Sequence, residues 1–256
     1  KKLLLLLLLS FGFIGLVNSA SAVSSLVIAP FKVESGAESG AIIANIIRDN
    51  LNLSGQFNAV IDSKPVTNQI DFGYWKQQKK DAIVFGRLEK VSSKVFNIYI
   101  YVYDINSEKQ LYAKKIAIHS TGTRRIAHYL SDKIYYILLG KEGSFDTSLA
   151  YVTVTGDEKS GLTYRLQISD SDGHNPQTVV RSDKPILSPS WSPDQKQLAY
   201  ISLKNGQAEA FVSNPYDKSL PIKLPKLDGI AAEPSWHPNG ESVLLTLSTS
   251  YNEGNY

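Results

Sequence analysis

The histidines are the first side chains to weigh as ligands or general bases. The chain has four, His119, His128, His174 and His237, and they stand at no metal-ligand spacing such as that of H-E-x-x-H. The sequence holds neither a Walker A motif nor a G-x-S-x-G elbow. Because cysteine is absent, thiolate chemistry, zinc ribbons and disulfides are excluded. We therefore predict no catalytic residues, no cofactor and no metal site, and hence a protein that is not an enzyme.

One loop resembles a calcium site. Asp170, Asp172 and Gly173 have the spacing of part of an EF-hand loop. The first ligand position of such a loop would fall on Ile168, which cannot coordinate an ion, and the closing acid is missing as well. We predict a hairpin turn here.

A stripe of tyrosines is the remaining feature with binding potential. Over residues 95–103 the chain alternates strictly, which places Tyr99, Tyr101 and Tyr103 on one face of a strand and aliphatic side chains on the other. Such a stripe can stack bases in single-strand binding sheets. The net charge is only +3, however, and Lys1 and Lys2 contribute two of these charges. A near-neutral chain lacks the basic surface that nucleic acid requires, so we expect no nucleic-acid partner and a packed or half-exposed sheet face.

The first 22 residues have the pattern of an export signal. Lys1 and Lys2 precede an apolar core that ends before Ala20-Ser21-Ala22, a small-x-small cleavage sequence. The apolar stretch is interrupted and too short for a membrane anchor. We predict cleavage near Ala22, a mature chain without a membrane span, and a periplasmic location, since an exported chain without cysteine fits that compartment.

Residues 24–146 alternate between strand and helix patterns, which predicts a small α/β domain. A helix is expected between Ser39, as its cap, and Gly55, with a core-facing stripe of isoleucine that starts at Ile42. A closing helix carries apolar residues up to Leu138 and ends at Gly140. Strands are expected over 26–31, 57–61, 81–86, 95–103 and 111–118, with a short helix around Tyr74 and Trp75.

Residues 149–256 contain a repeat. The sequence PSWSPD at 189–194 returns as PSWHPN at 234–239, 45 residues later, and a short apolar strand follows each copy. Residues 149–152 match the same strand. A period of this length built from short strands is typical of an all-β propeller, of which 149–256 would hold about 2.4 blades. A propeller of 4 to 8 blades could not close, so we expect this sequence to be truncated.

The repeated residues have mechanical roles. Proline fixes φ, and the side chain of the Asp or Asn that follows it hydrogen-bonds to nearby backbone. Each Pro-Asp or Pro-Asn pair therefore makes a tight turn. The tryptophan supplies a flat surface to bury between blades. The predicted structural-repeat residues are Pro189, Trp191, Pro193, Asp194, Pro234, Trp236, Pro238 and Asn239.

Three segments give the sequence a family resemblance: DAIVFG at 81–86, the stretch from YRL to SDSDGHN at 164–175, and LSPSWSPD at 187–194. Together with the export signal they resemble the TolB family, the periplasmic components of the Tol-Pal system. The resemblance implies a six-bladed propeller behind the α/β domain. It also implies a non-enzymatic adaptor that binds the lipoprotein Pal through the propeller and links the inner and outer membranes. The resemblance further implies roles in envelope integrity and cell division, and use of the protein by colicins for import.

The resemblance leaves two points open. Family members carry a longer segment after the signal that contacts TolA, whereas only Val23, Ser24 and Ser25 precede the first expected strand here. The residues that contact partners are not predicted. The alternative is the N-terminal part of a prolyl-oligopeptidase-like peptidase, whose propellers have similar repeats. The N-terminal α/β domain favours the TolB resemblance.

Overall fold

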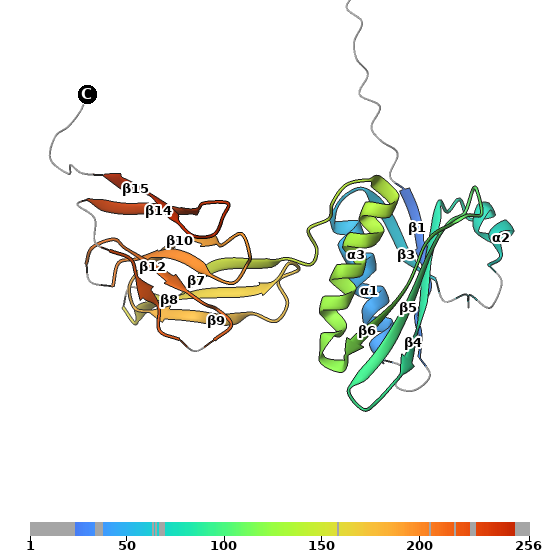
Figure 1. The fold of residues 1–256 in the computed structure, drawn as a ribbon, viewed down its shortest axis with the longest axis horizontal. Helices are drawn as coiled ribbons and strands as arrows, with labels where there is room; N and C mark the ends of the chain where they lie inside the picture. The colour runs from blue at the N-terminus through green and yellow to red at the C-terminus, as the bar shows by residue number, and fades with distance from the viewer. Residues whose placement is uncertain are drawn as a thin grey trace, which may run out of the picture.

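The computed structural model describes residues 24–33, 38–62, 64, 66, 70–157, 159–204, 206–217, 219–225 and 229–248. The predicted export signal, 1–22, lies outside these residues. The described chain forms an α/β domain and a stack of antiparallel sheets, joined by a connection over 140–147 (Figure 1). No helix among these residues has the length and apolar character needed to cross a membrane.

The α/β domain is built on a mixed six-stranded sheet of order β3-β1-β4-β5-β6, in which the short β2 also pairs with β4. β1 is parallel to β3 and β4, whereas β4, β5 and β6 form an antiparallel meander. The strands are β1 (Ser24–Ile28), β2 (Lys32–Val33), β3 (Phe57–Ile61), β4 (Ala82–Lys90), β5 (Val95–Asp104) and β6 (Gln110–His119).

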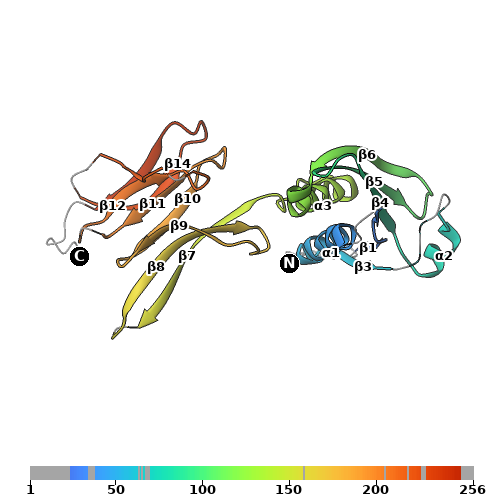
Figure 2. The same ribbon diagram turned by 90° about the horizontal axis from the view of Figure 1, so that it is seen from below.

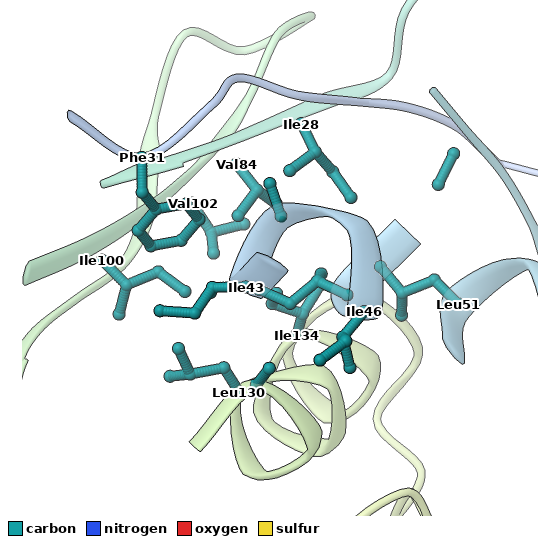
Figure 3. Close-up of a cluster of buried hydrophobic side chains, with 14 of the residues drawn as sticks. Ile28, Phe31, Ile43, Ile46, Leu51, Val84, Ile100, Val102, Leu130 and Ile134 are labelled. Carbon is teal, nitrogen blue, oxygen red and sulfur yellow. The ribbon is translucent and has the colours of Figure 1, made fainter. Parts of the chain in front are cut away.

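Two helices cover one face of this sheet, α1 (Glu38–Leu53) and α3 (Thr123–Leu139), the latter preceded by the 3-10 turn η1 (Ser120–Gly122). Figure 2 shows them side by side. The core lies between helices and sheet, where apolar side chains at helical spacing meet those that alternate along β4 and β5 (Figure 3). Its fully buried members include Ile28, Ile43, Ile47, Leu51, Val84, Ile98, Ile100, Val102, Leu130 and Ile134.

The helix ends partly follow the predictions. Gly140 takes the left-handed conformation, with φ 68°, and its N–H donates to Tyr136 O, so it closes α3 as expected. Two expectations for α1 are wrong. Ser39 lies inside the helix, because the helix begins at Glu38. Ile42 is 42% exposed, because its position falls at the solvent edge of the apolar stripe.

The other face of the sheet carries a smaller apolar cluster. The short helix α2 (Phe72–Gln77) is capped by Asp71, whose carboxylate accepts the N–H of Tyr74. It buries Trp75 against Val27 and Ile83. No helix of the described residues covers the rest of this face, which bears the predicted tyrosines.

The second part of the chain consists of three antiparallel sheets. The first has three strands, β7 (Ser148–Asp157), β8 (Gly161–Asp170) and β9 (Gln177–Ser182). The second has four, β10 (Ile186–Trp191), β11 (Leu198–Ser202), β12 (Glu209–Ser213) and β13 (Ile222–Lys223). The third has two, β14 (Ile230–Trp236) and β15 (Val243–Ser248). The predicted class, a small α/β domain followed by repeated all-β sheets, is confirmed.

The sheets stack as successive units of one repeat. β14 packs against β11, and β10 packs against β7 in the same manner. β7 therefore occupies the position of β11, the second strand of its unit, in agreement with the match between residues 149–152 and 198–201. Both β10 and β14 carry a register shift beside Pro189 and Pro234, and the preceding residues, Ser188 and Glu233, have positive φ.

Candidate functional site

The two parts of the chain meet where α3 faces the turn between β8 and β9. Nε of Arg124, on the first turn of α3, lies 3.1 Å from Asp170 Oδ2. A second nitrogen of the same guanidinium donates to Asp172. The turn is closed by Gly173 N–H donating to Asp170 O, so the predicted hairpin turn is present. One arginine of the α/β domain thus binds two carboxylates of the first propeller sheet.

His128 lies one helical turn further along α3 and is only 3% exposed. Its Nδ1 is 2.9 Å from Asn50 Nδ2, which also donates to Ser131 Oγ. Because Ser131 Oγ donates to Ala127 O, it must accept from Asn50, and this fixes the orientation of the amide. His128 Nδ1 is therefore an acceptor, and the neutral ring carries its proton on Nε2.

The proton on Nε2 points towards the propeller. Nε2 lies 3.8 Å from Asp172 Oδ2 and has no hydrogen-bond partner among the described residues. Burial lowers the pKa of His128, and the nearby Asp172 carboxylate only partly offsets this effect. The pKa of Asp172 is also lowered: burial raises it, but the His174 N–H and the Arg124 guanidinium outweigh burial. The site is thus an arginine held between carboxylates beside a neutral histidine.

The connection between the domains is bound to the same helix. Asp132 accepts the backbone N–H groups of Phe145, at 2.7 Å, and Asp146, at 2.9 Å. From the propeller side, Ser171 Oγ donates to Phe145 O at 2.6 Å. The Phe145 ring packs edge-on against Tyr135, with centroids 5.7 Å apart. These contacts restrict the connection on both sides.

Gly143 is needed for this path. A Cβ on Gly143 would lie 2.2 Å from Asp132 Oδ1 and 3.0 Å from Asp132 Cα. The backbone can approach α3 this closely only because glycine lacks that atom.

The cluster also brings together possible metal ligands. One ligand atom each from His128, Asp170 and Asp172 lies within 4.8 Å of the others. The sequence did not predict this group, because the residues come from two domains and share no spacing. A signal was present nonetheless: Arg124 and His128 stand four apart on a helix, and the two aspartates stand two apart in a turn. Because Arg124 already pairs with both carboxylates and Nε2 carries a proton, the arrangement fits an ion-pair cluster better than a metal site.

The repeat residues lie at the turns and contacts between sheets. Trp236 Nε1 donates to Ser190 O at 3.1 Å, which connects the third sheet to the second. Trp191 packs against Tyr216, with centroids 6.3 Å apart. Asp194 and Asn239 each accept the backbone N–H two residues ahead, at 3.1 and 3.0 Å. Pro189 and Pro234 lie within the register shifts, and Pro193 and Pro238 are the second residues of the turns closed by Gln195 N–H to Ser192 O and by Gly240 N–H to His237 O.

Family models match both parts of the chain. The TolB amino-terminal domain matches residues 14–111, and the TolB beta propeller domain matches residues 135–256. The chain belongs to the TolB family. A TolB relative from Ruthia magnifica, described as a Tol-Pal system protein, is 52% identical over 231 residues, or 90% of this chain. One from Nitrosococcus oceani is 33% identical over 204 residues, or 78% of this chain.

The fold agrees with a solved member of the family. The crystal structure of TolB from Acinetobacter baumannii superposes with a TM-score of 0.76 at 29% identity, covering 88% of this chain and 55% of that one. The predicted propeller is therefore confirmed as a partial one. The chain spans about half the length of the curated TolB relatives it matches, 54% for the Ruthia protein and 47% for the Nitrosococcus protein.

Proposed function

We propose that this chain is part of a periplasmic, non-enzymatic adaptor of a Tol-Pal system. The observation that carries the proposal is the 52% identity, over 90% of the chain, to a protein described as a Tol-Pal system protein TolB. The propeller would present the surface for Pal, and the α/β domain would serve the inner-membrane side, including TolA. In the cell, the protein would support envelope integrity and division, and colicins would use it for import.

The junction supports an adaptor of this kind. Arg124 binds the propeller turn directly, and Asp132 and Ser171 hold the connection from opposite sides. The contacts give the domains a defined relative position, which independent domains on a free linker would lack.

The proposal also covers the export of the protein and the division of the chain into domains. Residues 1–22 would direct export and be removed near Ala22, residues 24–146 would form the α/β domain, and residues 149–256 would begin a six-bladed propeller. Amino-terminal sequencing of the exported protein would test the cleavage. A protein that keeps residues 1–22 after export would contradict it.

The test of function is binding to Pal. Full-length protein and the soluble domain of Pal from the same organism would be titrated by isothermal calorimetry. We expect saturable one-to-one binding, and deletion of the propeller should abolish it. If the full-length protein shows no heat of binding and does not co-purify with Pal, the adaptor proposal is wrong.

A further inference from the structure

We propose that the uncovered face of the α/β sheet binds an acidic, extended segment of a partner protein. This face lies opposite α1 and α3 and contains a groove of about 980 Å³. Its lining combines the rings of Phe85, Tyr101 and Tyr103 with the basic side chains of Lys32 and Arg87. The proposal is independent of any binding of Pal by the propeller.

Basic residues form a row straight across the sheet. Lys32 on β2 is in register with Arg87 on β4, Arg87 with Tyr99 on β5, and Tyr99 with Lys115 on β6. Residues in register project from the same face. Three strand spacings of about 4.8 Å make the row about 14 Å long, which an extended peptide covers in about four residues. Acidic residues four positions apart in a peptide laid across the strands are about 13 Å apart, so they would meet Lys32 and Lys115 at the two ends of the row.

The carboxylates near the row already have partners. Asp71 pairs with Lys64 at 3.0 Å and accepts the Tyr74 N–H, and these bonds lower its pKa. Glu89 accepts the Tyr99 hydroxyl at 2.7 Å and lies 3.6 Å from Arg87 Nη1, so it pairs with one member of the row. Lys32, by contrast, is exposed and forms no ion pair with any described residue. Lys32 is thus available for an anionic ligand, and the single carboxylate of Glu89 leaves the row with a net positive charge.

The aromatic rings favour carboxylates over flat ligands. Phe85 stacks with both Tyr101 and Tyr103, whose ring centroids lie 5.2 and 5.9 Å from its own. Two cations lie over the Tyr99 ring, Arg87 at 3.8 Å and Lys115 at 5.2 Å from its centroid. Sugars and bases need free ring faces, whereas ring edges carry partial positive charge and attract acceptors. The geometry therefore favours an acidic polypeptide over a glycan or a nucleic acid.

The test uses a defined probe and matched variants of the purified chain. The probe is a fluorescein-labelled decapeptide of alternating glutamate and serine, titrated by fluorescence anisotropy. We expect saturable binding that weakens as NaCl rises from about 20 to 300 mM. The double variant with Lys32→Gln and Lys115→Gln should weaken binding by about tenfold or more. Lys114→Gln is the control, since Lys114 lies beside Lys115 on the same strand but on the opposite face. This variant should bind the peptide as tightly as the unaltered chain does.

Several outcomes would overturn the proposal. One is the absence of saturable peptide binding, and another is a loss of affinity in Lys114→Gln as large as that in the double variant. Tighter binding of labelled oligo-thymidine or of chondroitin sulfate than of the peptide would instead assign the face to a nucleic acid or a glycan. Circular dichroism spectra matching the unaltered chain would establish that each variant is folded.

Discussion

Arg124 Nε lies 3.1 Å from Asp170 Oδ2, so a helix of the α/β domain is bound directly to the first sheet of the propeller. The arginine side chain is 29% exposed and the aspartate 32% exposed. Partial burial reduces the screening that weakens surface ion pairs. The pair is therefore suited to holding the two domains in one relative position.

Removing this arginine should loosen the junction. Arg124→Gln deletes the positive charge that pairs with Asp170 and Asp172, and we expect a loss of about 1–3 kcal/mol in the free energy of unfolding. Arg125→Gln is the matched control, because Arg125 is 86% exposed and lies 3.8 Å from its partner, Asp146. Its effect should stay within about 0.5 kcal/mol. Calorimetry would measure both variants, and equal effects would contradict the coupling role of Arg124.

His128 should make stability depend on pH. Its pKa in the folded chain lies below the ordinary 6.5, so on acidification the unfolded chain binds a proton before the folded chain does. Stability should therefore be intact above pH 6.5 and fall as the pH drops through the range between the ordinary and the folded pKa. Arg124 opposes protonation, whereas Asp170, Asp172 and Asp146 favour it without reversing the effect of burial.

The variant His128→Gln tests this dependence. Urea unfolding between pH 7 and pH 5 should give a flatter stability profile than that of the unaltered chain. His174→Gln, at an exposed histidine in the adjoining turn, should leave the profile unchanged. An unaltered slope in His128→Gln would show that other groups cause the dependence.

Gly143 should not tolerate even a methyl group. In Gly143→Ala the new Cβ would collide with Asp132, and the two backbone hydrogen bonds of that carboxylate would be strained or lost. We expect a destabilisation of about 1–3 kcal/mol by thermal unfolding. In Gly73→Ala the Cβ would meet nothing closer than 3.7 Å. This helical control should be neutral or stabilising by up to about 1 kcal/mol.

The repeated tryptophans should differ in their response to loss of the indole N–H. Trp236→Phe removes the bond to Ser190 O and should cost about 1 kcal/mol. Trp191 Nε1 is buried without a hydrogen-bond partner among the described residues. Trp191→Phe in this chain should therefore cost less. Amide hydrogen exchange in the second and third sheets would measure the difference, and a larger loss for Trp191→Phe would contradict it.

Local patterns predicted much of the fold. The strict alternation over residues 95–103 identified both faces of β5, since side chains of a strand alternate between faces whatever surrounds them. Gly140 marked the end of α3, because only glycine readily takes the left-handed conformation. The limits of α1 were less certain: Ser39 was expected to cap a helix that in fact begins at Glu38. Intrinsic preferences near a helix end are weak enough for tertiary packing to shift the boundary.

The sequence by itself determined the elements, the repeat and the family, because these depend on periodicity and on residues close together in the chain. Only the tertiary structure decided which polar groups meet. Arg124 and Asp170 are 46 residues apart and belong to different domains, and Lys32 joins Arg87 and Lys115 only when four strands of the sheet align in register. Such contacts depend on the relative placement of whole elements, which is set by the packing of apolar faces and leaves no local signal at the polar residues themselves.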